Sequence, residues 1–197
     1  MQLFGKNLHL NSREKPDGNG SRADWSTLVE GCRRGDRRFQ KALYDALSAK
    51  MFAVCLRYMD NRDEAEDILQ DGFVTLYSKL DSYTGAGSFE GWARKIFVNT
   101  ALMSLRKKNV LKQSEDVQEA RWISSDEPTP IQKIGYRELS KMISELPPGF
   151  RTVFNMYIIE GYSHKEIAEA LGVSEATSRS QLQRARALLQ GKIKERY

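Results

Sequence analysis

The sequence predicts an all-α protein with two small helical domains joined by a flexible acidic linker, the second being a helix-turn-helix domain. Apolar residues recur at helical spacing in several separate segments. No run of alternating strands, Gly-rich phosphate loop or internal repeat of about 20–50 residues occurs. With 197 residues, 40% of them apolar, the chain can fill one large core or two modest ones.

The composition excludes several classes of protein. No stretch approaches the ~18 uninterrupted apolar residues of a membrane helix, and the first 24 residues lack the apolar core of a secretory signal. We therefore expect a cytoplasmic protein with no direct membrane insertion. Cys32, Cys55, His9 and His164 form no CxxC pair and no usual zinc ligand set, so we expect no metal site and no cofactor.

Residues 1–23 are polar, contain Pro and Gly and show no periodicity, so we predict a disordered tail. Residues 24–108 are predicted to form one helical domain. Asp24 and Asp36 are placed to cap its first two helices, Asp60 or Asn61 its third, and Ser88 its fourth. The predicted inward residues of the longer helices are Phe39, Leu43, Leu47, Met51, Val54, Tyr58, Ala65, Ile68, Leu69, Phe73, Leu76, Leu80, Trp92, Ile96, Leu102 and Leu105.

Residues 109–128 are acidic and Ser-rich without a sustained apolar stripe, which indicates a linker. Residues 129–197 are predicted to form the second domain. Thr129-Pro130 is a typical helix start, and Pro147-Pro148 ends that helix. A further helix is expected over 150–159, with Val153, Phe154, Tyr157 and Ile158 inward.

The strongest local pattern covers residues 163–189. Ser163 and Glu166 are spaced as a capping box, Gly172 permits a tight turn, and Ser174 can cap the next helix. This order is that of a helix-turn-helix, whose second helix enters the DNA major groove. His164 is expected to be exposed or to face phosphate. The candidate DNA-binding residues on the second helix are Thr177, Arg179, Ser180, Gln183 and Arg184. An ordinary helical hairpin with a solvated basic face is the alternative.

Acidic side chains repeat at i and i+4 along one side of the predicted third helix. Such like-charge pairs destabilise an isolated helix by a few tenths of a kcal/mol, about 0.2–0.5 per pair. A basic partner would relieve this repulsion, and solvation of the acidic side chains is the alternative.

The segment after the Gly85–Ser88 break interleaves aromatic and basic residues. That combination suits a surface that holds a nucleic-acid strand while its bases stack. The alternative is that the aromatics belong to the core and the basic residues to solvent. The candidate residues here are Ser88, Phe89, Trp92, Arg94, Lys95, Asn99, Arg106 and Lys107.

The net charge of +5 conceals blocks of opposite sign. Residues 91–114 sum to +6 and residues 176–194 to +5, whereas residues 61–90 and 115–175 each sum to −5. This segregation indicates that some surfaces bind phosphate and others bind a basic partner.

Taken together, these segments resemble bacterial sigma factors of the extracytoplasmic-function type over roughly residues 25–108 and 135–190. Residues 61–73 look like that family's polymerase-binding helix, and the segment beginning Phe89-Glu90-Gly91-Trp92 is similar to its melting and minus-ten recognition segment. Residues 174–186 resemble its minus-thirty-five recognition helix. Ser178, Gln181 and Met103 depart from the residues common in the family.

The resemblance implies that residues 24–108 are sigma region 2, that residues 129–197 are region 4, and that the partners are core RNA polymerase, promoter DNA and an anti-sigma factor. It assigns polymerase binding to Asp63, Glu64, Asp67, Gln70, Asp71 and Phe73. The sequence contains no catalytic residue set, so we expect neither an enzyme nor a small-molecule substrate. The alternatives are a helix-turn-helix regulator that is not a polymerase subunit and a pure protein-interaction adaptor.

Overall fold

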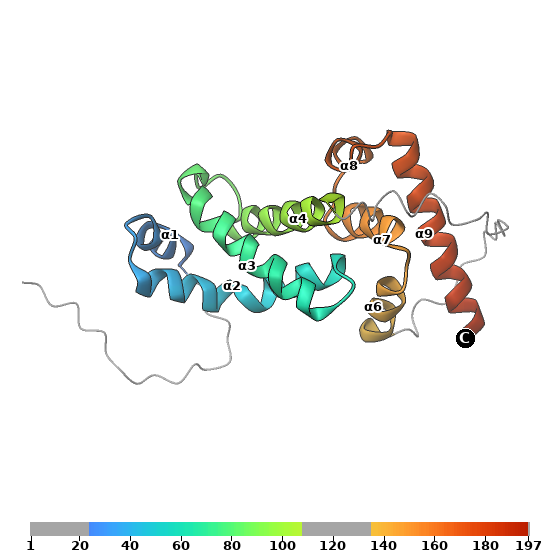
Figure 1. Cartoon of the computed structure of the whole chain (residues 1–197), viewed down its shortest axis with the longest axis horizontal. Helices are drawn as coiled ribbons and strands as arrows, with labels where there is room; N and C mark the ends of the chain where they lie inside the picture. The colour runs from blue at the N-terminus through green and yellow to red at the C-terminus, as the bar shows by residue number, and fades with distance from the viewer. Residues whose placement is uncertain (1–23, 108–134, 197) are drawn as a thin grey trace, which may run out of the picture.

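The computed structural model describes residues 24–107 and 135–196, and every element within these ranges is helical (Figure 1). The all-α fold class is therefore confirmed. The N-terminal half contains α1 (Trp25–Arg33), α2 (Arg37–Tyr58), α3 (Arg62–Lys79), η1 (Leu80–Ser82) and α4 (Phe89–Lys107). The C-terminal half contains α6 (Tyr136–Ser144), α7 (Pro148–Phe154), η3 (Asn155–Ile159), α8 (His164–Leu171) and α9 (Glu175–Arg196). The predicted tail, linker and Thr129-Pro130 helix start lie outside the described residues.

The N-terminal helices begin at the residues predicted to cap them. The side chains of Asp24, Asp36, Asn61 and Ser88 accept hydrogen bonds from backbone N–H groups at 2.9–3.4 Å. Each bond satisfies a donor that has no partner within the helix itself. Local sequence alone therefore set these four helix starts.

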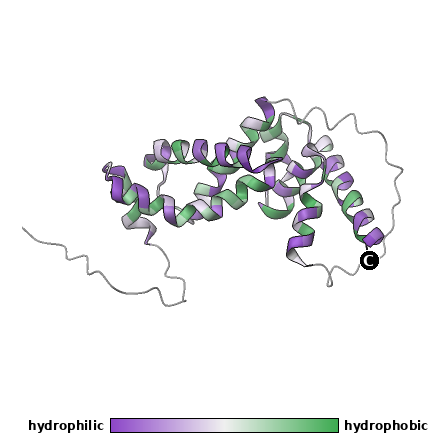
Figure 2. Ribbon diagram, turned by 60° about the horizontal axis from the view of Figure 1, so that its bottom comes forward, coloured by the Kyte–Doolittle hydropathy of each residue, from purple (hydrophilic) through white to green (hydrophobic). Residues whose placement is uncertain are grey.

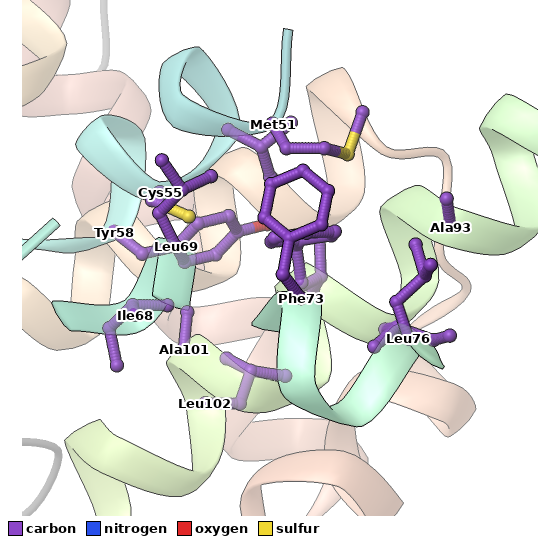
Figure 3. Packing of buried hydrophobic residues seen from close by; sticks show 14 of the residues in the cluster. Met51, Cys55, Tyr58, Ile68, Leu69, Phe73, Leu76, Ala93, Ala101 and Leu102 are labelled. Atoms are coloured by element: carbon purple, nitrogen blue, oxygen red, sulfur yellow. The ribbon is translucent and has the colours of Figure 1, made fainter. Parts of the chain in front are cut away.

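The core of the N-terminal half lies between α2, α3 and α4, where Met51, Tyr58, Phe73 and Leu102 pack together (Figure 3). Helices α3 and α4 approach closely at Gly72, because a Cβ built there would lie 2.3 Å from the Phe97 ring. The glycine therefore lets a fully buried aromatic ring fill the space between the two helices.

The C-terminal half has a smaller core of its own, which α6, α7, α9 and the connection between α6 and α7 form with Met142, Leu146, Phe150, Ala185, Leu189 and Ile193. The predicted helix over 150–159 is present, but its last five residues form the π-helical turn η3. The N–H of Glu160 donates to the carbonyl of Asn155, five residues back, at 3.0 Å. The wider turn shifts the register, so the prediction that Ile158 points inward is wrong and the residue is exposed.

The two halves pack against each other (Figure 1). Buried residues of α7, η3, α8 and α9, such as Val153 and Met156, join the same apolar cluster as the N-terminal core. Hydrophobic and hydrophilic residues alternate around the helices (Figure 2), as expected for amphipathic helices packed on one side. No helix in the described ranges is long and apolar enough to cross a membrane.

Candidate nucleic-acid interface

Helix α3 carries an exposed acidic face made of Asp63, Asp67, Gln70 and Asp71. The capping bond from Asn61 starts the helix directly before this face, and residues four apart then stack along one side. Val74 follows on the same side, and 70% of its surface is exposed. Sequence reasoning missed Val74, although helical spacing from Gln70 and Asp71 could have found it. The face therefore combines negative charge with one apolar side chain.

Phe73 lies in the core, as the apolar periodicity predicted, although the resemblance also assigned it to polymerase binding. Only 4% of its surface is exposed, and its ring packs against Tyr44, Tyr77 and Phe97 at centroid distances of 4.5, 6.0 and 5.1 Å. Its position on the wheel turns it away from the acidic face toward α2 and α4 (Figure 3). Glu64 is half-buried, at the edge of the acidic face.

Helix α4 presents a stripe of four exposed residues at i, i+4 spacing, which are Lys95, Asn99, Met103 and Lys107. We call these residues the α4 stripe. Sequence reasoning identified the two lysines and Asn99 but gave Met103 no role, although 68% of its surface is exposed. The stripe offers two cations, an amide and a flexible apolar side chain, which are groups that can hold a nucleic-acid backbone and contact bases.

The aromatic residues at the start of α4 divide between core and surface. Phe89 is buried against Trp25, Tyr83 and Trp92, with ring centroids 5.1–5.6 Å apart, so its side chain is not available to a nucleic acid. Trp92 is half-buried on the same cluster. Ser88 is exposed, and its hydroxyl caps the helix. The structure thus supports the core alternative for Phe89.

Two basic residues of α4 are engaged by the C-terminal half. The guanidinium of Arg94 lies 3.6 Å from a carboxylate oxygen of Glu160. The guanidinium of Arg106 donates to the backbone carbonyl of Ala170 in α8. In this arrangement both cations already have a partner in the C-terminal half.

Helix α9 begins as predicted, with the Ser174 hydroxyl accepting from the N–H of Thr177 at 3.0 Å. Arg179 and Gln183 are exposed on its outer side, and Arg184 is half-buried. Arg179 forms an ion pair of 2.6 Å with Glu175, one turn earlier. Ser180 donates to the carbonyl of Thr177 at 3.0 Å. The five predicted residues therefore gather on the first three turns, where a recognition helix contacts base edges.

The capping box before α8 and the turn before α9 are both present. Ser163 and Glu166 exchange the two capping bonds, and the N–H and hydroxyl of Ser163 both donate to the Glu166 carboxylate, which lowers the pKa of that carboxyl. Gly172 ends α8 in the left-handed conformation, with φ of 70°, as the tight turn requires. These two devices hold α8 and α9 in the helix-turn-helix arrangement.

His164 faces the inside of the helix-turn-helix rather than solvent alone. Its Nδ1 lies 2.9 Å from the Ser178 hydroxyl, and its ring stacks on Tyr157 at 4.5 Å. Burial lowers the pKa of His164, and the nearby Arg179 lowers it further. Ser178 is fully buried, and this contact gives its hydroxyl a partner. The histidine thus ties the start of α8 to α9.

Within the described ranges, no group of three or more His, Cys, Asp and Glu side chains could hold a metal ion. The arrangement offers surfaces for binding: an acidic face on α3, a basic stripe on α4 and a helix-turn-helix on α9.

Two family models match the chain and together span more than half of it. Residues 43–110 match sigma-70 region 2, and residues 136–189 match sigma-70 region 4. The first match contains the acidic face and the α4 stripe, and the second contains the helix-turn-helix.

Curated relatives are similar over most of the chain. The ECF RNA polymerase sigma-E factor of Haemophilus influenzae is 27% identical over 177 residues, covering 84% of this chain and 93% of the relative. SigW of Bacillus subtilis is 26% identical over 178 residues, covering 85% and 95%. SigE of Mycolicibacterium smegmatis is 29% identical over 145 residues, covering 71% of this chain and 56% of that longer relative.

Among solved structures, a sigma factor from Bartonella quintana in complex with an anti-sigma factor is similar, at 24% identity and a TM-score of 0.49. The similarity covers 78% of this chain and 96% of that chain.

Proposed function

Because this chain belongs to the sigma-70 family as a sigma factor of the extracytoplasmic-function type, we propose that its acidic face binds core RNA polymerase while α4 and α9 bind promoter DNA. The observation that carries this division is the placement of three surfaces of different chemistry on three separate helices. A regulator that acted through α9 alone would leave the acidic face and the α4 stripe without a role.

The acidic face of α3 is proposed to dock on a basic surface of the polymerase. Asp67 and Asp71 stand one turn apart on this exposed face, and a cationic partner would relieve their mutual repulsion. Val74 adds an apolar contact beside them. Charged groups of this kind steer the encounter and fix its orientation, while the apolar contact adds affinity.

Helix α9 is proposed to read the upstream promoter element as duplex. Arg179, Gln183 and Arg184 carry donors that match guanine and adenine edges, and the same groups can hold phosphates. Small residues on either side of them, Ala176 and Ala187, allow the backbone to approach the groove.

The α4 stripe is proposed to capture the opened downstream element. Separating a base pair costs on the order of 1.4 kcal/mol per step, so strand capture must supply part of that energy. Lys95 and Lys107 would hold the backbone, while Asn99 and Met103 contact bases. The half-buried Trp92 is the aromatic residue of α4 that still reaches the surface at its start.

We propose that the chain acts as a binding subunit in the cytoplasm, where RNA polymerase works, and performs no catalysis of its own. We also expect an anti-sigma partner, because members of this family are commonly held inactive by one that covers the polymerase-binding surfaces.

The test is reconstituted transcription with purified core polymerase, comparing charge reversals on and off the acidic face. Asp71→Lys is expected to weaken polymerase association and leave duplex binding unchanged. Asp81→Lys is the matched control, since Asp81 is almost fully exposed on η1 and away from the acidic face. Equal effects of the two substitutions would contradict the assignment. Failure of the native chain to bind core enzyme or start transcripts would contradict the function itself.

A further inference from the structure

A buried carboxylate joins the two halves of the chain. Glu160 follows η3 in the C-terminal half, and only 3% of its side chain is exposed. One of its oxygens lies 2.7 Å from a guanidinium nitrogen of Arg57 at the end of α2, and the other lies 3.6 Å from that of Arg94 in α4. Two cations of the N-terminal half therefore surround one anion of the C-terminal half.

A second set of polar contacts supports this junction. The buried guanidinium of Arg151 in α7 lies 2.6 Å from Asp60 and donates to the backbone carbonyl of Tyr58 at 3.3 Å. The side-chain amide of Asn155 donates to the carbonyl of Arg57 at 2.7 Å. The carbonyls at the C-terminal end of α2 thus receive their donors from the other half of the chain.

This junction is poorly satisfied for a permanent contact. Four buried side-chain atoms have no hydrogen-bond partner within the described part of the protein, and all four lie here: Arg57 Nε, the Tyr58 hydroxyl, Arg151 Nε and Asn155 Oδ1. Burial raises the pKa of the Tyr58 hydroxyl, and the nearby Glu160 raises it further. Because each unpartnered buried group is costly, and native cores contain few of them, these four atoms weaken a junction that the shared apolar cluster otherwise stabilises.

The Glu160 carboxylate occupies a site whose chemistry suits phosphate. Paired guanidinium groups bind carboxylate and phosphate oxygens by the same charge-assisted hydrogen bonds. Arg94 also precedes Lys95, the first residue of the α4 stripe. Both line a cleft of about 380 Å³ between α4 and the segment from Ile159 to Glu166. Glu160 and Glu166 also line this cleft, so a nucleic-acid strand lying along the stripe would meet the Arg94 guanidinium beside competing negative charge as long as Glu160 stays in place.

We propose that Arg57 and Arg94 form a binding site for a DNA phosphate, and that Glu160 occupies this site in the free chain and holds the two halves closed. The assignment of DNA as the ligand rests on the proposed function. Arg57 thereby gains a role in DNA binding, and the closed chain binds DNA weakly because its phosphate site and Arg106 are both engaged.

The first test measures binding of a fluorescent single-stranded DNA of about 12 nucleotides to the full chain without polymerase. Glu160→Gln removes the competing charge, and Glu169→Gln is the matched control, because Glu169 is exposed on α8 in the same half. If the closed state holds about nine-tenths of the molecules, Glu160→Gln is expected to raise the affinity up to about tenfold. The control is expected to change it little. An equal gain in both variants would overturn the proposal.

A double variant identifies the site. Adding Arg57→Gln to Glu160→Gln is expected to return the affinity to that of the Glu169→Gln control. Retention of the full gain in the double variant would show that Arg57 holds no phosphate, and would overturn that assignment.

Small-angle X-ray scattering follows closure directly and does not depend on polymerase or DNA. The radius of gyration is expected to increase in Glu160→Gln and to stay unchanged in Glu169→Gln. If Glu160→Gln loses its helical circular dichroism signal, Asp60→Asn replaces it as the variant that opens the chain. This substitution removes the ion pair with Arg151 at a carboxylate that is half exposed. An unchanged radius of gyration in a folded Glu160→Gln variant would overturn the proposal that Glu160 holds the two halves closed. Opening with no gain in DNA binding would refute the phosphate site, and failure to support transcription would bear on the sigma function alone.

Discussion

Phe73 and Val74 are neighbours on α3 that face opposite ways, so substituting each by alanine separates folding from partner binding. Phe→Ala in a core costs about 3–5 kcal/mol of unfolding free energy. Phe73 is almost fully buried and packs on three other rings, each such pair adding about 0.5–1.5 kcal/mol. We therefore expect Phe73→Ala to lose about 4–5 kcal/mol. Val74→Ala is expected to stay within about 0.5 kcal/mol of the native chain, because its side chain is mostly exposed.

Urea denaturation followed by circular dichroism gives both stabilities, and association with core polymerase is then measured where both variants remain folded. Phe73→Ala is expected to bind polymerase normally per folded molecule. Val74→Ala is expected to lose about 1 kcal/mol of association free energy, as its two missing carbons are desolvated in the complex. The reasoning is refuted if Phe73→Ala unfolds within about 1 kcal/mol of the native chain, or if its folded fraction binds polymerase more weakly than Val74→Ala does.

Three further outcomes are expected. Gly72→Ala is expected to lower the urea midpoint of denaturation although alanine has the better helix propensity, because the new Cβ would meet the Phe97 ring. Gly191→Ala, in open space on α9, is expected to raise the free energy of unfolding by about 1 kcal/mol in the same urea titration. Arg184→Ala is expected to cost about 1–3 kcal/mol of discrimination between matched and mismatched duplexes in a binding assay, and a uniform loss on all sequences would indicate a phosphate contact instead. The folded-state pKa of His164 is lowered, so neutral His164 stabilises the fold above the unfolded pKa of about 6.5, and this stabilisation is lost as the pH falls through the folded-state pKa. Urea titrations on either side of pH 6.5 therefore give two free energies of unfolding, and the difference between them is expected to be smaller in His164→Gln than in the native chain.

The helices and their starts could be predicted because they depend on neighbours in sequence. The capping bonds at Asp24, Asn61 and Ser163 each join residues three apart, and the apolar stripes repeat within two turns. The acidic face followed from the same periodicity. These features survive any tertiary arrangement, because they are set within a single turn of helix.

Errors arose where one residue fitted both a surface and a core assignment. The apolar periodicity placed Phe73 inward, which its burial confirms, whereas the resemblance to sigma factors assigned the same residue to polymerase binding. For Phe89 the sequence left a nucleic-acid contact and a core position open. Packing decided it, by enclosing both rings among other aromatics. Ile158 was misplaced because the π-helical turn breaks the regular period.

The sequence by itself determined the all-α class, the order of the helices, the helix-turn-helix and the alternation of charge along the chain. Only the tertiary structure decided which cations are free, since Arg57 meets Glu160 across 103 positions and Arg106 meets Ala170 across 64. The physical reason is that helices and caps arise from bonds within about four residues, while contacts between helices depend on how whole faces pack. Local pattern therefore located the binding helices, and packing between the halves decided which of their side chains are available.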